Sequence, residues 1–448
     1  MAAPLLTFYG DDFTGSSAVM EVLSFAGIET MLFLDVPDAC TLEQYPNLKA
    51  IGVAGIARTK SDVWMRANLP PVFEGLKKLG APLCHYKVCS TFDSAPNTGS
   101  IGVAAEVGKE VFDPKWIPLV VGAPAIGRYQ VFGTLFAAAS GEIHRLDRHP
   151  VMSGHPVTPM DEADLGRHLS RQTGLRTARI DYLTARSGGS EMALRQVVQA
   201  GASIVALDSM DETTLEIAGR LIDQERPGFA IGSQGIEYAL VAHWRASGQL
   251  PGTIPSPKLA PVDQLFAVTG SCAPTTATQI ERTEAAGFAV LDLDAAKAAD
   301  KTALDAETAR VQAEALTLLS EGRDVLVTTA RGPDDPAVQR MNAAIAESGL
   351  SSESANANLG KALGHLVAEI RRSTGLPRIA VGGGDTSGHV LTELQADALS
   401  AVAPLAPGAP LCRVHAPQQP EIDGLEVTLK GGQMGSPDFF IQTKTGAL

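Results

Sequence analysis

Short apolar runs alternate with stretches of helical periodicity along most of the chain. Residues 5–9 (LLTFY) are apolar, and the segment after them places Val19, Val22, Leu23 and Ala26 on one helical stripe. Other strand-like runs are TMLFLD, AIGVAG, IPLVVGAP, SIVALDS, FAVTGS, DVLVTTA and RIAVGGG. Such alternation is typical of α/β layers with mainly parallel strands. We therefore predict an α/β fold.

The alternation is interrupted once, at residues 247–264. This segment, SGQLPGTIPSPKLAPVDQ, carries four prolines and two glycines and fits neither periodicity. A chain of 448 residues also exceeds the usual size of one domain. We predict an N-terminal domain over 1–250, a linker over 251–262 and a C-terminal domain over 263–448.

Composition and charge narrow the classes of function. Apolar residues make up 45% of the chain, which favours a globular protein over a disordered one. A formal charge of −14 disfavours nucleic acid or an anionic membrane as a partner. The beginning, MAAPLLTFYGDD, lacks a basic region and no apolar run reaches membrane-spanning length, so we expect a cytoplasmic protein.

Three glycine turns in the C-terminal half follow predicted strands. They are AVGGGDTSGHVLTEL, FAVTGSCAPTTATQIE and LKGGQMGSPDFF. Glycines let the backbone approach a phosphate closely, and Ser271 stands where it can cap a helix or contact a phosphate. Asp385 and Thr386 can hold a metal or a ribose hydroxyl. The spacing matches neither the P-loop nor GxGxxG, so tight turns without a ligand remain an alternative at this point.

Charged residues of the N-terminal half also follow predicted strands. Asp11 and Asp12 lie at the first strand-to-helix turn, where one carboxylate could bind a hydroxyl or metal and the other accept a proton. The alternative for Asp12 is a helix N-cap. Arg58, Lys87 and Arg128 each come just after an apolar run. If they converge, they form a pocket for a small carboxylate; otherwise each is a surface ion pair.

Taken together, these motifs resemble the four-carbon acid sugar kinase family. The resemblance spans nearly the whole chain, through GDDFTG, GIARTKS, YKVCSTFDS, HPVTPM, GSQGIEYAL, TGSCAPTTATQI, GGGDTSG and LKGGQMGSPDFF in the family's order. It implies two α/β domains with the active site in the cleft between them. The N-terminal domain would bind an acid sugar such as threonate, erythronate or 3-oxo-tetronate, and the C-terminal domain ATP with Mg²⁺.

The resemblance also assigns roles to residues. Asp12 becomes the candidate base for the sugar hydroxyl, with Asp11, Arg58, Lys87 and Arg128 around the substrate. The nucleotide contacts it implies are Ser271, Gly383, Gly384, Asp385, Thr386 and Gly432. It indicates no specific metal ligand, and a homodimer is one option for the assembly.

Three turns depart from the family's usual pattern. The chain has GGQMG where GNFG-like turns are usual, GAPAIGR for PAFPxxGR, and GSQG for GSAG. The last two fall in the predicted substrate domain and leave the identity of the acid sugar open. Two other classes stay open: a nicotinamide-dependent oxidoreductase of a small hydroxy acid, which should show GxGxxG after its first strand, and a non-catalytic binding protein.

Overall fold

The computed structural model describes residues 3–139, 141–155, 157–252, 254–255 and 257–447. Two compact units divide at Pro255 and Ser256. No strand or helix occurs among the described residues between Ala246 and Phe266. The predicted linker lies in this segment, and its residues 253 and 256 fall outside the described residues.

The first unit contains a parallel sheet with the strand order β2-β3-β1-β4-β11-β5-β10-β9. Its strands are β1 Leu6–Gly10, β2 Thr30–Phe33, β3 Ala50–Ala54, β4 Leu83–Lys87, β5 Ile117–Val120, β9 Thr177–Ile180, β10 Ile204–Leu207 and β11 Gly228–Gly232. Its helices are α1 Phe13–Phe25, α2 Ala39–Glu43, α3 Asp62–Lys78, α4 Ile101–Phe112, α5 Leu165–Ser170, α6 Tyr182–Arg186, α7 Ser190–Gln199, α8 Glu212–Glu225 and α9 Gly235–Ala246.

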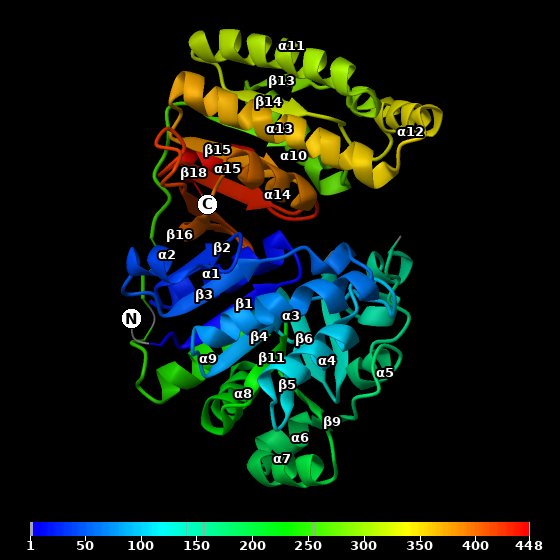
Figure 1. The fold of residues 1–448 in the computed structure, drawn as a ribbon, viewed down its shortest axis with the longest axis vertical. Helices are drawn as coiled ribbons and strands as arrows, with labels where there is room; N and C mark the ends of the chain where they lie inside the picture. Colours follow the sequence, from blue (N-terminus) through cyan, green and yellow to red (C-terminus); the bar gives the residue numbers. More distant parts are fainter. Residues whose placement is uncertain (1–2, 140, 156, 253, 256, 448) are drawn as a thin grey trace. The chain divides into compact units, whose positions relative to one another are not determined.

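Helices connect successive parallel strands of this sheet, as parallel pairing requires. Helix α3 packs beside α4, and α8 packs beside α9 (Figure 1). A separate antiparallel sheet follows β5 and consists of β6 Arg128–Val131, β7 Thr134–Ala139 and β8 Glu142–Arg145. The apolar pattern alone did not predict this small sheet.

The second unit has the strand order β13-β14-β12-β15-β18-β17-β16. Its strands are β12 Phe266–Thr269, β13 Ala289–Asp292, β14 Val325–Thr328, β15 Arg378–Gly382, β16 Ala398–Ala406, β17 Ala409–His415 and β18 Glu426–Lys430. Its helices are α10 Pro274–Ala285, α11 Lys301–Ser320, α12 Pro336–Ser348, α13 Ser352–Thr374, α14 Gly384–Glu393 and α15 Phe439–Thr445.

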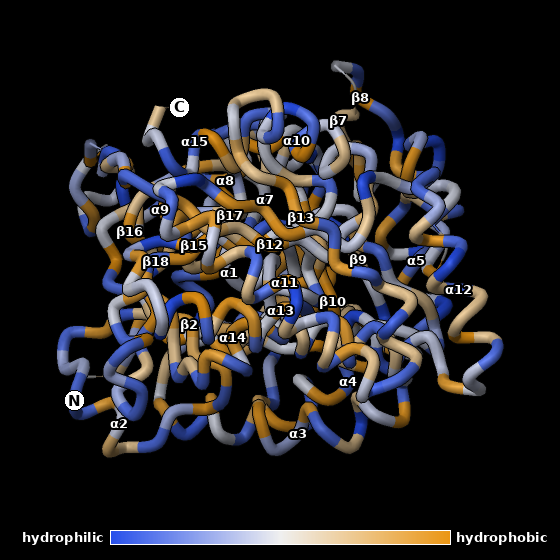
Figure 2. Tube along the Cα trace, turned by 90° about the horizontal axis from the view of Figure 1, so that it is seen from above, coloured by the Kyte–Doolittle hydropathy of each residue, from blue (hydrophilic) through white to orange (hydrophobic). Residues whose placement is uncertain are grey.

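The five strands β13, β14, β12, β15 and β18 pair in parallel. Strand β17 is antiparallel to both of its neighbours, β16 and β18. Helix α13 buries the stripe predicted for it, including Leu359, Leu363 and Ile370, and it runs beside α11 (Figure 1). Figure 2 shows a hydrophobic tube at β13, and all four residues of β12 are buried. The prediction of α/β units with mainly parallel strands is confirmed.

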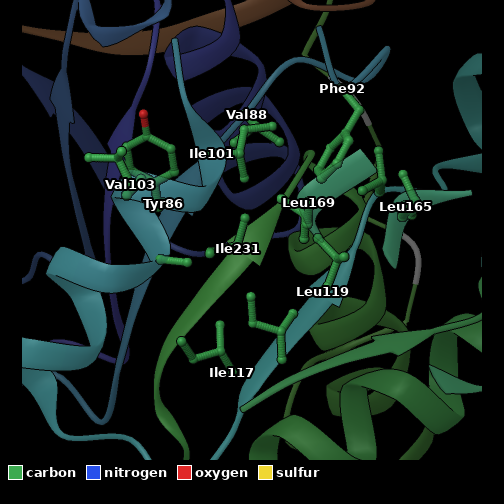
Figure 3. Packing of buried hydrophobic residues seen from close by; sticks show 14 of the residues in the cluster. Tyr86, Val88, Phe92, Ile101, Val103, Ile117, Leu119, Leu165, Leu169 and Ile231 are labelled. Carbon is green, nitrogen blue, oxygen red and sulfur yellow. The ribbon is translucent and has the colours of Figure 1, made fainter. Parts of the chain in front are cut away.

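Each unit has its own hydrophobic core. In the first unit, buried side chains of β4, β5 and β11 pack with those of α3, α4 and α5. Figure 3 shows part of this cluster, including Ile231 of β11 and Ile117 and Leu119 of β5. The second core joins side chains of β12, β14 and β15 with Phe439 and Phe440 of α15. These cores fix the strand ends, where the polar residues of interest lie.

Candidate active site and nucleotide site

The first candidate site lies at the carboxyl ends of β1 and β4. Strand register places Gly10 opposite Lys87, and the amide of Asp11 donates to the carbonyl of Lys87 at 2.9 Å. The chain leaves β1 on one side, toward β2, while β4 lies on the other. Open α/β sheets bind ligands at such a topological switch point.

Four predicted residues meet there, and we call Asp11, Asp12, Arg58 and Lys87 the N-terminal cluster. Arg58 bridges the two aspartates, with Nη2 at 2.6 Å from Asp11 Oδ1 and Nη1 at 2.7 Å from Asp12 Oδ2. Gly15 lies against them: a Cβ added to it would stand 3.1 Å from Lys87 Nζ and 3.4 Å from Arg58 Nη2. The surface ion pair that was the alternative for Arg58 and Lys87 does not describe these residues, because both side chains lie within the cluster.

Asp12 caps helix α1 and also lies in the N-terminal cluster, so its two predicted roles, as a helix cap and as a site residue, are compatible. Its Oδ1 accepts from the amide of Gly15 at 2.7 Å and so caps α1, and its Oδ2 accepts from Thr14 Oγ1 at 2.8 Å. Its side chain is 24% exposed, whereas that of Asp11 is 2% exposed. Asp12 is therefore the carboxylate of the pair that a ligand can reach.

Burial gives Asp11 and Arg58 unusual protonation behaviour. Burial raises the pKa of Asp11 to about 6, although Arg58 opposes this shift. Burial disfavours the charged form of Arg58 as well, but the carboxylates of Asp11 and Asp12 outweigh it and hold the pKa of Arg58 well above its ordinary value. The pair is thus held together by mutual attraction in a site where an isolated carboxylate would take up a proton.

Lys87 is buried and lies beside residues that sequence reasoning did not single out. Its Nζ donates to the carbonyl of Val88 at 2.6 Å. Asp93 accepts from Thr91 Oγ1 at 3.0 Å. Burial alone would raise the pKa of Asp93, but Arg58 and the bonds from Cys89 and Thr91 lower it. Cys89 and Asp93 belong to the motif YKVCSTFDS, so their closeness to Lys87 in the sequence could have identified them as neighbours of the site.

Arg128 is not hydrogen-bonded to the N-terminal cluster. Its Nη1 donates to the carbonyls of Ile126, Gly127 and Ala138 at 3.2–3.3 Å, and no described residue bonds to its buried Nε. Burial lowers the pKa of Arg128, and Cys89 opposes this shift; the pKa of Cys89 itself responds to burial, Asp93, Arg58 and Lys87. Cys89 therefore links Arg128 to the cluster electrostatically, and Nε of Arg128 remains a buried donor without a partner among the described residues.

The second candidate site lies at the carboxyl ends of β12, β15 and β18. We call Ser271, Gly383, Gly384, Asp385, Thr386 and Gly432 the C-terminal cluster. A Cβ on Gly432 would stand 2.5 Å from Ser271 Oγ, and one on Gly383, whose φ is +116°, would stand 2.8 Å from Thr386 Oγ1. The positive φ of Gly383 favours glycine at that position, and a side chain at Gly432 would displace the Ser271 hydroxyl, so both glycines allow the three turns to meet closely.

The ends of two helices face this cluster. Helix α14 begins at Gly384, with Asp385 exposed in its first turn, and a Cβ on Gly384 would meet nothing within 4 Å. Helix α10 begins at Pro274, and its Thr276 Oγ1 lies 3.2 Å from Ser271 Oγ and 2.9 Å from the carbonyl of Gly432. Free amides at helix starts favour anions such as phosphate.

Lys430, the last residue of β18, is a further member that sequence reasoning missed. Its Nζ donates to Thr276 Oγ1 at 3.0 Å. The signal was present in the quoted motif LKGGQMG: a lysine ends an apolar strand directly before the glycine pair. Within the part of the chain that the structure describes, no group of three or more His, Cys, Asp or Glu side chains forms a metal site.

Comparisons with known proteins agree with this division. Residues 6–240 match the family model of a sugar-binding N-terminal domain, and residues 266–440 match that of a nucleotide-binding C-terminal domain. The chain belongs to the four-carbon acid sugar kinase family. It is therefore a kinase, a phosphotransferase that acts on a sugar-acid hydroxyl and uses ATP. This membership excludes the oxidoreductase and the non-catalytic binding protein as its class.

Individual relatives support the assignment over the full length. A 3-oxo-isoapionate kinase of Paraburkholderia graminis is 45% identical over 449 residues, covering 100% of this chain and 95% of that protein. A 3-oxo-tetronate kinase of Methylobacterium radiotolerans is 31% identical and covers 96% of each. A solved Haemophilus influenzae structure has the same fold, with a TM-score of 0.72 at 20% identity and 98% coverage of both chains.

No helix among the described residues is both long and apolar enough to cross a lipid bilayer.

Proposed function

We propose that the N-terminal cluster binds the sugar acid and the C-terminal cluster binds ATP, and that the kinase phosphorylates one hydroxyl of a small 3-oxo sugar acid. The observation that carries this proposal is the bridge from Arg58 to Asp11 and Asp12 beside the buried Lys87. It combines two cations that suit a carboxylate with one reachable carboxylate that suits a hydroxyl. The active site between the two domains stays a prediction.

Asp12 is the proposed general base. As the substrate hydroxyl oxygen forms its bond to the γ-phosphorus, the bond from that phosphorus to the bridging oxygen of ADP breaks, and the hydroxyl proton passes to a carboxylate oxygen of Asp12. Arg58 orients this carboxylate through its 2.7 Å bond to Oδ2. Lys87 and Arg128 are proposed to attract the substrate carboxylate.

The C-terminal cluster supplies amides for the phosphates of ATP. Phosphoryl transfer depends mainly on positioning and on neutralising charge, so backbone amides at Gly383 and Gly432 suit the task. Mg²⁺ would neutralise phosphate charge when bound with the nucleotide. Such an ion usually takes one or two carboxylates and completes its shell with phosphate oxygens and water, which fits the single exposed carboxylate of Asp385.

The identity of the acceptor is tested by a coupled ADP-release assay. The acceptors are 3-oxo-isoapionate, 3-oxo-tetronate, threonate, erythronate and one decarboxylated analogue. We expect the 3-oxo acids to be used best, with 3-oxo-isoapionate first because of the 45% identical relative. Equal turnover of the decarboxylated analogue would contradict a carboxylate site at Arg58 and Lys87.

The cellular compartment of the enzyme can be proposed from its phosphate donor, ATP. Because ATP is a cytoplasmic metabolite, we propose that the enzyme acts in the cytoplasm. The homodimer considered from the sequence stays a prediction, and light scattering during size-exclusion chromatography tests it.

A further inference from the structure

Lys430 is a buried ammonium group without an acidic partner among the described residues. Its relative exposure is 0%, and its Nζ donates only to Thr276 Oγ1 at 3.0 Å and to the carbonyl of Gly431 at 3.3 Å. Both acceptors are neutral. An ammonium group withdrawn from water without a counter-charge destabilises a fold, so its presence requires another explanation.

Among the described residues, no titratable side chain around Lys430 balances its charge. Helix α10 offers Thr276, helix α15 offers the rings of Phe439 and Phe440 at 5.9 and 6.0 Å, and β15 offers Gly382, whose added Cβ would stand 3.5 Å from Lys430 Cε. The acidic residue before α15, Asp438, pairs with Arg282.

The acidic residue on α14, Asp385, is exposed in the first turn. Burial lowers the pKa of His389 on the same helix, to which Asp385, Lys361 and Glu393 also contribute. Neither residue contributes to the protonation of Lys430, for which burial is the cause of the shift. The positive charge of Lys430 is therefore uncompensated within the described residues.

Lys430 is, however, one hydrogen bond from the C-terminal cluster. Thr276, which accepts from Lys430, also lies 3.2 Å from Ser271 Oγ and 2.9 Å from the carbonyl of Gly432. The amide of Gly383 donates to the carbonyl of Lys430 at 2.8 Å. Hydrogen bonds thus link Lys430 to all three turns of the cluster, directly or through Thr276.

We infer that Lys430 is a positioning residue for the nucleotide: it holds the Ser271 and Gly432 turns through Thr276, and its charge is neutralised by the phosphates of bound nucleotide. This inference rests on the proposed function, which places the nucleotide at the C-terminal cluster. It assigns the missing counter-charge to the ligand rather than to the protein.

The inference predicts a link between nucleotide binding and protonation. Burial lowers the pKa of Lys430 to about 8. Phosphates nearby favour the charged form, so bound nucleotide raises this pKa again. Nucleotide affinity is then complete below pH 8 and falls toward tenfold per pH unit above it.

Calorimetric titration of the full chain with ADP at pH 7 to 9.5 tests this link. In the wild type we expect the affinity to fall above pH 8, with uptake of about half a proton per ADP at pH 8 when buffers of different ionisation enthalpy are compared. Lys430→Met should bind ADP at least tenfold more weakly at pH 7 and lose this pH dependence. Lys430→Arg should restore the affinity at pH 7 without the fall above pH 8, because the guanidinium stays charged.

The matched control is Lys444→Met, in the same unit. Lys444 pairs with Asp324 at 2.7 Å, and its removal should leave the pH profile for ADP unchanged. The proton uptake of the wild type decides the question even if Lys430→Met does not fold. An affinity that is flat from pH 7 to 9.5 without proton uptake overturns the inference.

A second variant separates this inference from the proposed function. Gly384→Val tests the site itself. If it weakens ADP binding while the Lys430 profile is flat, only the inference on Lys430 is wrong. If Gly384→Val binds ADP as the wild type does, the nucleotide lies elsewhere, and the site and the inference are both wrong.

Discussion

The adjacent carboxylates Asp11 and Asp12 occupy different environments, and this difference sets what each can do. Asp11 is buried and bound to Arg58, while Asp12 is partly exposed and caps α1. Only a reachable carboxylate can accept a proton from a ligand. Asp12 is therefore the proposed proton acceptor, and Asp11 is the residue that orients Arg58.

Asp12→Asn is expected to lower kcat at least a thousandfold while ADP affinity remains within twofold. The amide keeps an oxygen for the capping bond from Gly15, since asparagine caps helices about as well as aspartate, but it cannot take up the proton. Single-turnover kinetics and calorimetry measure the two quantities. Asp38→Asn, at the equivalent cap of α2, is the matched control and should keep full activity. Wild-type turnover in Asp12→Asn would remove it as the base.

Asp11→Asn is expected to stabilise the protein and to impair catalysis. Because the pKa of Asp11 in the fold is about 6, above its ordinary 3.8, the folded state holds the proton more tightly. The stability from this group is present below pH 4 and is lost as the pH rises through 6. At pH 7.5 the variant should gain about 1–3 kcal/mol in urea unfolding, with no gain at pH 3.5.

The catalytic rate of the wild type should depend on pH in the opposite direction to this stability term. Wild-type kcat/KM should fall as the pH drops through about 6, because protonated Asp11 no longer holds Arg58 as an ion pair. In Asp11→Asn, kcat/KM should be at least tenfold lower and should no longer fall as the pH drops through about 6.

For the stability prediction, an Asp11→Asn variant that is less stable than the wild type at pH 7.5 would contradict the argument that burial disfavours the charged carboxylate.

At the scale of elements, the start of helix α14 is the simplest place to probe the nucleotide site. A Cβ on Gly384 meets no protein atom within 4 Å, so the fold should tolerate a larger side chain there. Open space at a helix start beside the glycine turns is where phosphate would lie.

Gly384→Val is therefore expected to melt within 2 °C of the wild type, roughly the scatter of neutral surface changes, and to weaken ADP binding at least tenfold. Differential scanning fluorimetry and calorimetric titration give the two values. Gly388→Val, one turn farther along α14 and equally open, should bind ADP normally. Equal weakening in both variants would show a general effect on the helix instead.

At the scale of the whole molecule, two units with separate cores should respond separately to their ligands. Hydrogen exchange measured by mass spectrometry on the full chain is expected to show ADP protecting 266–276, 379–388 and 428–436. The sugar acid should protect 8–17, 54–60 and 85–93, because bound ligands reduce local opening. ADP protection confined to the first unit would reverse the proposed assignment.

Much of the fold followed from the sequence because its signals are local. The apolar runs predicted β2, β3, β5, β10, β12, β14 and β15, and the stripe of α13 is buried as expected. The sheet β6-β7-β8 was not predicted. Strands β6 and β8 carry no continuous apolar run, and the apolar run LFAAA of β7, with Leu135 and Ala137 buried, was not recognised as a strand. Strand β17 was not among the predicted strands, and its antiparallel pairing could not be predicted because pairing direction depends on the partner strands.

The sequence by itself determined the α/β class, the division into two units and the motifs that mark the family, since periodicity, prolines and glycine turns act over a few residues. Only the tertiary structure decided which charges meet. Asp11, Arg58 and Lys87 are brought together by the register of parallel strands, and Arg128 is held aside by backbone carbonyls. Lys430 gained its importance only through burial. Burial and convergence depend on contacts between residues far apart in the chain, and no local sequence pattern encodes such contacts.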